Sequence, residues 1–394
     1  MADLLQKLLL ETLPRSWLFL FLFLLFLVSV HYWFTRKFSV KRQRLPPSPS
    51  ALPIIGHLHL ISSLPHVSLR GLARKHGPDV MLLRLGAVQN LVVSYSRAAE
   101  AVLRTHDHVF ASRPHSVVSD TIMYGSSDIG FAPYGEYWRQ ARKLVTTHML
   151  SVKKVSMAMA KINEAAAADA AVDMSELLHT FANDMACRIV SGKFFLKDDQ
   201  SKLFGELIKD TSRLPGGFNL EEYFPTVGRV GVLKKAVCAK AKRDVFFGAI
   251  DTSANALEFT LAELMRKPQL MVKLQDEVRG IAPRGREIIS ETDMNNMTYL
   301  RAAIKESLRL HHLAPLLAPH LAMADCTIDG YIVPAGTRVV VNACAIGRDP
   351  SSWEYAQEFI PERFTHEGSS MHVNLRGMIS SSCRSEQDGG CALV

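Results

Sequence analysis

The sequence predicts a mainly α-helical protein that carries small β-sheets. Beyond residue 60 most of the chain spaces its apolar residues at the helical repeat, and only short runs beside turn residues alternate as strands do. The 394 residues, 48% of them hydrophobic, are enough for one large folded unit. The six cysteines are scattered and form no C-x-x-C pair, which argues against a zinc site and a disulfide framework.

The N-terminal segment predicts a membrane anchor over residues 1–37. Residues 17–34 read WLFLFLFLLFLVSVHYWF, contain no Asp, Glu, Lys or Arg, and are just long enough to cross a bilayer. A cleaved signal peptide is the alternative, but the run does not end in small residues. Basic residues follow at Arg36, Lys37, Lys41, Arg42 and Arg44. Because these positive charges follow the apolar run directly, much of the net charge of +8 is expected to contact a membrane surface rather than nucleic acid. Their position also predicts that the main domain is cytosolic.

Residues 38–53 form a basic and proline-rich hinge, because proline stiffens an extended connector. Beyond the hinge we expect helices at 68–75, 96–105, 156–171, 175–189 and 245–265. Residues 79–85 and 90–94 predict one β-hairpin. Residues 326–332 and 337–342 predict a second one, turning at 334–336.

Two pairs of residues on predicted helices suggest chemistry. Trp138 and Arg142 are four residues apart and face the same way, so an indole N–H and a guanidinium could hold a carboxylate together. An amphipathic surface helix would show the same pattern. Asp251 and Thr252 stand inside an apolar helix, where a carboxylate is costly unless it is functional and a threonine can open the helix locally. The alternative is a solvent-facing pair.

A third group combines a helix with a distant loop. Glu306 and Arg309 are three residues apart in an E-x-x-R pattern and can pair on one helix face. Arg363, in the segment Pro-Glu-Arg-Phe, could arrive from a loop and complete a buried triad. The E-x-x-R pattern alone is weak, because ordinary helices contain many such pairs.

In this order and spacing, from the anchor to about Gly377, these motifs resemble the cytochrome P-450 family, plant microsomal type. The resemblance implies a P-450-like fold in which Trp138, Arg142 and position 320 hold the haem propionates. Arginine is usual at position 320, but this chain has His320, which predicts a weaker and pH-dependent contact. Asp251 and Thr252 would deliver protons to the reacting oxygen. Glu306, Arg309 and Arg363 would lock the core behind the haem, and residues 113–131 and 313–318 would line the substrate pocket.

The same resemblance implies a haem-thiolate monooxygenase that inserts one atom of O₂ into a small hydrophobic substrate. An NADPH-dependent reductase on the same endoplasmic reticulum membrane would supply electrons. No nucleic-acid partner is expected.

The predicted haem monooxygenase-like domain, residues 54–377, departs from the family pattern at two places. The basic stretch 234–243 runs directly into Asp244, whereas family members place a further helical region there, so a gap is expected at 243–244. Gly248-Ala249 inverts the usual Ala-Gly order and narrows the oxygen groove. The fold is therefore expected to be incomplete, and the lost core should weaken a domain whose stability is ordinarily only about 5–15 kcal/mol.

The tail, residues 378–394, lacks the Phe-x-x-Gly-x-Arg-x-Cys-x-Gly loop whose thiolate binds the iron, so no metal ligand is assigned. With permitted synonymous codons, the codons of the tail can be read in another frame as HDFQLLPFGAGRRVCPG, with the cysteine on the Ala392 codon. We hypothesise that one nucleotide is missing near the Gly377 codon. Sequencing the transcript tests this, and unrelated codons there would disprove it.

Two other functions stay open from the sequence. The chain could be a catalytically inactive membrane-tethered remnant, or a gene-model fragment that binds no haem. It could also be a membrane-tethered binder of hydrophobic ligands, provided that residues 45–377 fold without haem.

Overall fold

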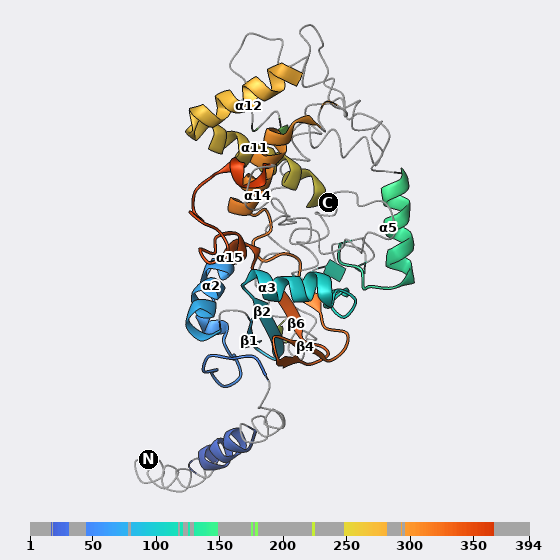
Figure 1. Cartoon of the computed structure of the whole chain (residues 1–394). Helices are drawn as coiled ribbons and strands as arrows, with labels where there is room; N and C mark the ends of the chain where they lie inside the picture. Colours follow the sequence, from blue (N-terminus) through green and yellow to red (C-terminus); the bar gives the residue numbers. More distant parts are fainter. Residues whose placement is uncertain are drawn as a thin grey trace, which may run out of the picture.

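The computed structural model is mainly helical with two small sheets, which confirms the predicted fold class (Figure 1). It describes residues 17, 19–30, 45–77, 80–116, 119–120, 125–126, 130–148, 175, 178–179, 223–224, 248–281, 293 and 296–365. The predicted helix at 156–171, nearly all of the one at 175–189, the 243–244 junction and the tail at 378–394 lie outside these residues.

The helices predicted at 68–75, 96–105 and 245–265 are present, with ends that differ by a few residues. The N-terminal helices are η2 (Leu58–Leu60), α2 (Pro65–His76), α3 (Ser96–Glu100), the π-helical turn η3 (Ala101–Thr105) and α5 (Glu136–His148). The later ones are α11 (Gly248–Arg266), α12 (Pro268–Ile281), α14 (Thr298–Leu310), α15 (Ala343–Gly347) and η4 (Pro361–Phe364). Proline begins α2 and η4, where its missing N–H is not needed.

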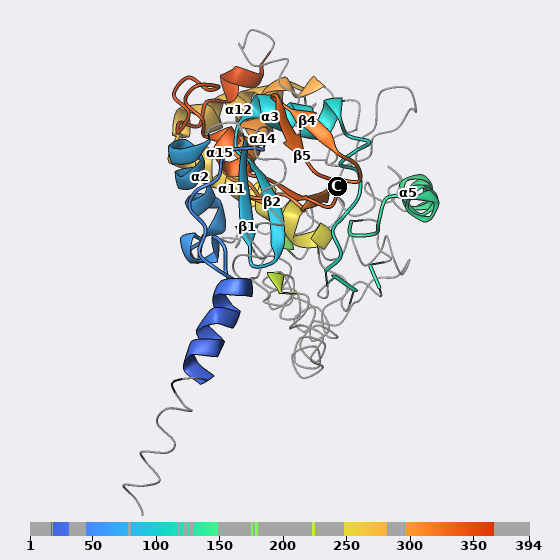
Figure 2. The same cartoon turned by 90° about the horizontal axis from the view of Figure 1, so that it is seen from below.

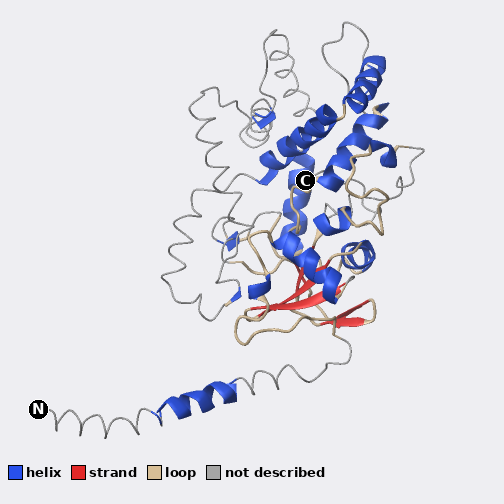
Figure 3. Ribbon diagram, turned by 90° about the vertical axis from the view of Figure 1, so that its left-hand side faces the viewer, coloured by secondary structure: helices blue, strands red, loops and turns tan. Residues whose placement is uncertain are grey.

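The larger sheet contains β1 (Val80–Leu85), β2 (Val88–Val93), β6 (Arg338–Val341) and β3 (His320–Leu321), in this spatial order. The first predicted hairpin is β1 and β2, which pair antiparallel from Val80 opposite Val93 to Leu85 opposite Val88. β6 pairs parallel with β2, although about 250 residues separate them in the sequence. Figure 3 shows the strands together at one end of the described part.

The second predicted hairpin was wrong. The chain reverses at Asp329-Gly330, so that β4 (Cys326–Ile328) pairs with β5 (Tyr331–Val333). Both turn residues have positive φ, 48° and 81°, as a two-residue hairpin turn that matches strand twist requires. Because the turn uses this segment, residues 338–341 join the larger sheet instead of pairing with 326–332.

Apolar packing connects the sheet and the helices. One buried cluster lies between the sheet, α3 and η3, and a second lies between α11, α12 and α14. α14 contacts α11, α12, α15 and η4, which makes it the central helix of the described part (Figure 1). This position explains why its polar residues are buried.

A helical stretch, residues 17 and 19–30, overlaps the predicted anchor and projects away from the other helices and the sheets (Figure 2). Its apolar side chains are exposed. Of the helices that the structure describes, none combines the length and the apolar character needed to cross a membrane. Much of the predicted anchor, including residues 1–16 and 31–37, lies outside the described residues.

Candidate functional site

A buried ion cluster lies where α14 meets η4. Glu306 and Arg309 are both fully buried, and the Arg309 guanidinium donates two hydrogen bonds, from Nε and Nη2, to the Glu306 carboxylate at 2.7 and 2.8 Å. Nε of Arg363, from η4, donates to the same carboxylate at 3.4 Å. The structure therefore brings together the three residues that the sequence pattern grouped.

Backbone groups complete the bonding of this cluster. Arg309 donates to the backbone carbonyl oxygens of Gly347 (2.5 Å), Ala356 (2.7 Å) and Glu358 (2.8 Å). The Glu306 carboxylate accepts from the N–H of Ile360 at 2.8 Å. The Arg309 guanidinium also lies 5.2 Å from the centre of the Trp353 ring. A buried charge is tolerated when its hydrogen bonds are satisfied, so this cluster ties the segment 347–363 to α14.

A close approach of two backbones is part of the same arrangement. A Cβ at Gly347 would collide with the carbonyl oxygen of Arg309 and with the ring of His312. Glycine at 347 therefore lets α15 reach the end of α14, which brings its carbonyl within reach of the Arg309 guanidinium.

His320, on β3, is buried, with 3% of its surface exposed. Its Nδ1 lies 2.6 Å from the carbonyl oxygen of Phe110, whereas its Nε2 is buried and has no hydrogen-bond partner among the described residues. Burial, followed by the nearby charge of Arg113, lowers the His320 pKa to about 4. Since a carbonyl accepts only from N–H, the neutral ring carries its proton on Nδ1 and presents a lone pair at Nε2.

Arg113 is a member of this site that the sequence pattern identified only as the start of a loop. Its guanidinium donates to the carbonyls of Ala318 and Pro319 at 3.0 and 3.1 Å, and Nε donates to Gly130. It thus joins the loop after residue 112 to the segment before β3. An arginine next to Pro114 in a loop gives no sequence signal for this contact, which depends on residues 205 and 206 positions away.

Trp138 and Arg142 lie next to each other on α5, and the Arg142 guanidinium is 5.1 Å from the centre of the indole ring. Tyr134 extends the group, with its ring centre 5.6 Å from that of Trp138. Partial burial lowers the Arg142 pKa. α5 stands at the edge of the molecule, apart from β3 (Figures 1 and 2). The structure therefore pairs Trp138 with Arg142 but does not bring them to His320.

Asp251 and Thr252 lie in the first turns of α11, as predicted for their backbone, and their side chains are outside the described residues. Farther along the same helix, Thr260, which the sequence pattern did not single out, donates from Oγ1 to the Ala256 carbonyl at 2.7 Å.

Two histidines at the end of α14 were missed by sequence reasoning. His311 Nε2 lies 2.9 Å from the Glu263 carboxylate of α11, and its ring stacks on Phe259. His312 lies near Arg348. Its burial, followed by the positive charge of Arg348, lowers the His312 pKa to about 4. Apolar periodicity gives no signal for these residues, because they follow the helix and their partners come from α11 and residue 348.

The described residues only partly fit a haem group. A neutral His320 has an acceptor where a propionate, itself an acceptor, needs a donor. The free cysteines among the described residues are Cys326 and Cys344, and neither stands in the loop pattern of a haem thiolate. Burial raises the pKa of Cys326, which is the opposite of what a thiolate ligand requires. No chemical step through an iron centre therefore follows from these residues.

Comparison with known proteins identifies the relatives of this chain. Residues 46–240 and 231–376 match the family described as Cytochrome P450. An indole-2-monooxygenase from Zea mays is 46% identical over 81% of this chain and 72% of its own length. A 3-hydroxyindolin-2-one monooxygenase from Zea mays is 43% identical over 86% of this chain and 76% of its own length. A solved zebra fish cytochrome P450 with progesterone, at 24% identity, has the same fold: the TM-score is 0.63 over 78% of this chain and 85% of that one.

Proposed function

The chain belongs to the cytochrome P450 family, as a plant member whose relatives are monooxygenases, and we propose that its substrate is a small indole-type heterocycle. The supporting observation is that two maize relatives, 46% and 43% identical to it, act on indole and on 3-hydroxyindolin-2-one, which share one fused bicyclic skeleton. The reaction class is insertion of one atom of O₂ by a haem-thiolate enzyme, with electrons from an NADPH-dependent reductase.

Within this function the site residues receive proposed roles. Asp251 and Thr252, near the start of α11, supply protons. Trp138 and Arg142 bind the carboxylates of the haem ring, and His320 joins them only when its ring is protonated, because Nε2 then carries a hydrogen that it can donate. Glu306, Arg309 and Arg363 hold the segment 347–363 against α14 and so fix the position of the chain up to residue 365.

We further propose that an error in the nucleotide sequence, and not loss of the activity, explains why the iron-binding loop and a stretch near residue 243 are missing. The two family matches overlap at residues 231–240 and the second ends at 376, next to the segments where the gap and the frame change are proposed.

A spectroscopic comparison tests this proposal. The full chain is expressed as it stands, and again after frame correction near the Gly377 codon and insertion of the region missing at 243–244. We expect a haem-thiolate band in the reduced, carbon-monoxide difference spectrum of the corrected protein only. Indole should then give an oxygenated product in the presence of reductase and NADPH.

The matched control is the corrected protein in which the restored cysteine is replaced by serine, which should lose the band. A corrected protein without the band would support the inactive remnant instead. A band together with turnover of other small hydrophobic compounds, but not of indoles, would retain the monooxygenase and reject the substrate.

We also propose that residues 1–37 anchor the protein in the endoplasmic reticulum membrane, with the main domain cytosolic. The exposed apolar side chains at 17 and 19–30 support this, because a contiguous exposed apolar surface marks contact with a membrane or another protein. We expect the full chain to stay in the membrane pellet after alkaline extraction and a chain beginning at residue 38 to leave it. Release of the full chain would contradict the anchor.

A further inference from the structure

The proline-rich hinge, of which the structure describes residues 45–53, lies along the outer edge of the larger sheet. Within the described part of the chain, β1 is an outer strand and pairs on one side with β2. Three N–H groups along its other side donate to the hinge and to the turn that follows it: Leu82 to the Pro47 carbonyl at 2.9 Å, Arg84 to the His57 ring at 2.8 Å, and Gly86 to the Ile55 carbonyl at 3.1 Å. The segment therefore covers an edge that would otherwise be open to another strand.

His57 supplies the central acceptor along this edge. It is 2% exposed, and its Nδ1 accepts the hydrogen bond from the Arg84 N–H. Nδ1 therefore carries the lone pair and Nε2 carries the proton, which Nε2 donates to the Pro49 carbonyl at 2.9 Å. One imidazole ring thus joins β1 on one side to the hinge on the other.

The turn between the hinge and His57 is built around the same residue of β1. Gly56 has a φ of 64°, and a Cβ there would collide with the Arg84 carbonyl oxygen, which accepts from the His57 N–H at 2.7 Å. Leu52 and Gly56 bond to each other through both backbone groups, at 3.0 and 3.1 Å. The Arg84 guanidinium donates to the Leu52 carbonyl at 2.9 Å. Arg84 and His57 together therefore fix the turn on β1.

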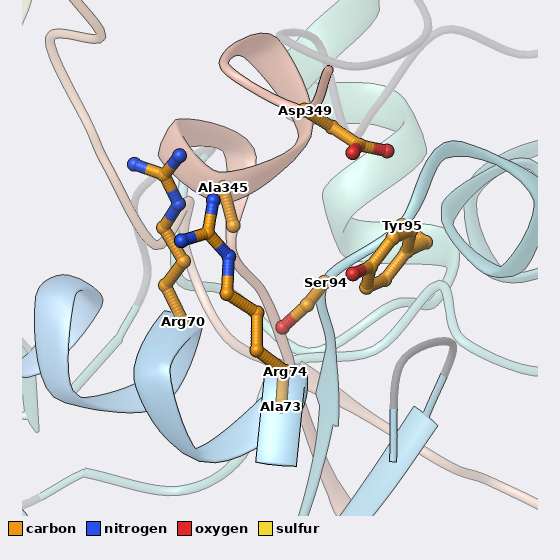
Figure 4. A pocket seen from close by; sticks show the side chains of 7 residues that line it. All are labelled: Arg70, Ala73, Arg74, Ser94, Tyr95, Ala345 and Asp349. Carbon is orange, nitrogen blue, oxygen red and sulfur yellow. The ribbon is translucent and has the colours of Figure 1, made fainter. Parts of the chain in front are cut away.

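The chain after this turn has attachments of its own. α2 contacts β1 and α15. The His66 carbonyl accepts from the Asn342 side chain at 2.8 Å, and the Arg70 guanidinium donates to the Arg348 carbonyl at 3.2 Å. In Figure 4 the Arg70 side chain rises from α2 towards the segment that contains Ala345. α2 is thus held on the domain by bonds other than those of the hinge.

We propose that His57 is a clip that holds the proline-rich hinge on β1 and so sets the length of the tether between the folded domain and the apolar N-terminal run. With the hinge attached, ten residues, 35–44, separate the end of that run at Phe34 from Leu45, and such a chain spans at most about 35 Å. With the hinge released as far as Gly56, the tether consists of residues 35–56 and spans up to about 75 Å. The short tether keeps the domain close to the bilayer, into which hydrophobic substrates partition. The tether role rests on the proposed membrane anchor, whereas the clip does not.

Hydrogen exchange of single backbone amides, measured by mass spectrometry on the full chain in detergent micelles, tests the clip. The informative amide is that of Leu82, because it bonds to Pro47 of the hinge and not to His57. His57→Phe keeps a ring of similar size and removes both side-chain hydrogen bonds. We expect exchange at Leu82 to become about three- to tenfold faster, since the net contribution of one hydrogen bond corresponds to a change of this size. Exchange in the middle of α14 should not change.

His57→Asn is a second variant, which retains a polar side chain. Its Oδ1 is able to accept from the Arg84 N–H as Nδ1 of the histidine does, but the shorter side chain does not extend to the Pro49 carbonyl. We expect the Arg84 amide to exchange as in the wild type while the Leu82 amide exchanges faster. This pattern assigns the attachment of the hinge to the Nε2 bond.

His59→Asn is the matched control. His59 is exposed, stands two residues from His57, and has its Nδ1 3.1 Å from the Gly56 carbonyl oxygen. Its substitution should change exchange at Leu82 by less than about twofold, as is usual for a surface position. Equal acceleration at Leu82 and in α14 would mean that His57 contributes only to global stability. An unchanged Leu82 amide in both His57 variants would mean that the hinge stays attached without the ring, and either result overturns the proposal.

Neutron reflectometry of the full chain in a supported bilayer tests the tether. We expect the protein layer of His57→Phe to extend farther from the bilayer than that of the wild type, within the limit of about 75 Å that the released tether sets. An unchanged layer, in a variant whose Leu82 amide exchanges faster, would overturn the tether role. Failure of the wild type to enter the bilayer would reject the anchor instead, and the exchange experiment in micelles would still decide about the clip.

Discussion

Two of the buried polar regions in the described part of the chain differ in how completely their hydrogen bonds are satisfied. At the Glu306–Arg309 pair the carboxylate and the guanidinium bond to each other, to Arg363 and to backbone groups. At His320 one ring nitrogen is bonded and the other, equally buried, has no partner within the described part of the chain. The first region uses its polar atoms to hold segments together, whereas the second leaves the buried Nε2 of His320 unbonded among the described residues. Burial alone therefore does not tell how completely a polar group is hydrogen-bonded.

Disrupting the Glu306–Arg309 pair should produce the largest effect on stability. Glu306→Ala leaves the Arg309 charge buried without its carboxylate, so we expect the free energy of unfolding to fall by about 3–5 kcal/mol. Urea denaturation of the full chain measures this loss.

The matched control is Glu100→Ala, which removes the partner of Arg104 from an exposed pair one turn apart, 3.3 Å between Nη1 and Oε1. That change should cost less than about 0.5 kcal/mol. Equal losses in the two variants would mean that burial of the Glu306 pair has no energetic consequence.

Acid should lower the stability of the protein through the incompletely bonded His320. The His320 pKa is lowered from 6.5 to about 4 in the folded protein, so the unfolded chain binds its proton first as the pH falls below 6.5. The contribution of the neutral ring is complete above pH 6.5 and is lost progressively until about pH 4. The loss approaches about 3 kcal/mol, since each pKa unit corresponds to about 1.4 kcal/mol.

We expect His320→Gln to remove this part of the pH dependence. The measurement is the difference in unfolding free energy between the variant and the wild type at about pH 7 and about pH 4.5, because carboxylates that titrate in both proteins then cancel. The wild type should lose stability relative to the variant as the pH falls. Parallel pH profiles would place the titrating group elsewhere, and His312, whose pKa is also lowered to about 4, is then the next residue to substitute.

Much of the fold was predictable because it depends on local patterns. The spacing of apolar residues located α2, α11 and the first hairpin, and the residues Asp329-Gly330 could have located the second hairpin, since both accept positive φ. The E-x-x-R spacing was enough to place Glu306 and Arg309 on one face of a helix, because residues three apart are neighbours there.

The remaining features depend on contacts between segments that are distant in sequence. Local patterns contain no information about the parallel pairing of β6 with β2, the contact of Arg113 with residues 318 and 319, or the unbonded nitrogen of His320. The sequence by itself determined the family motifs, the apolar N-terminal run and the absence of the cysteine loop, since these are properties of residue order. Only the tertiary structure decided which polar atoms are paired and which are left open, because hydrogen-bond saturation depends on the segments that packing brings together.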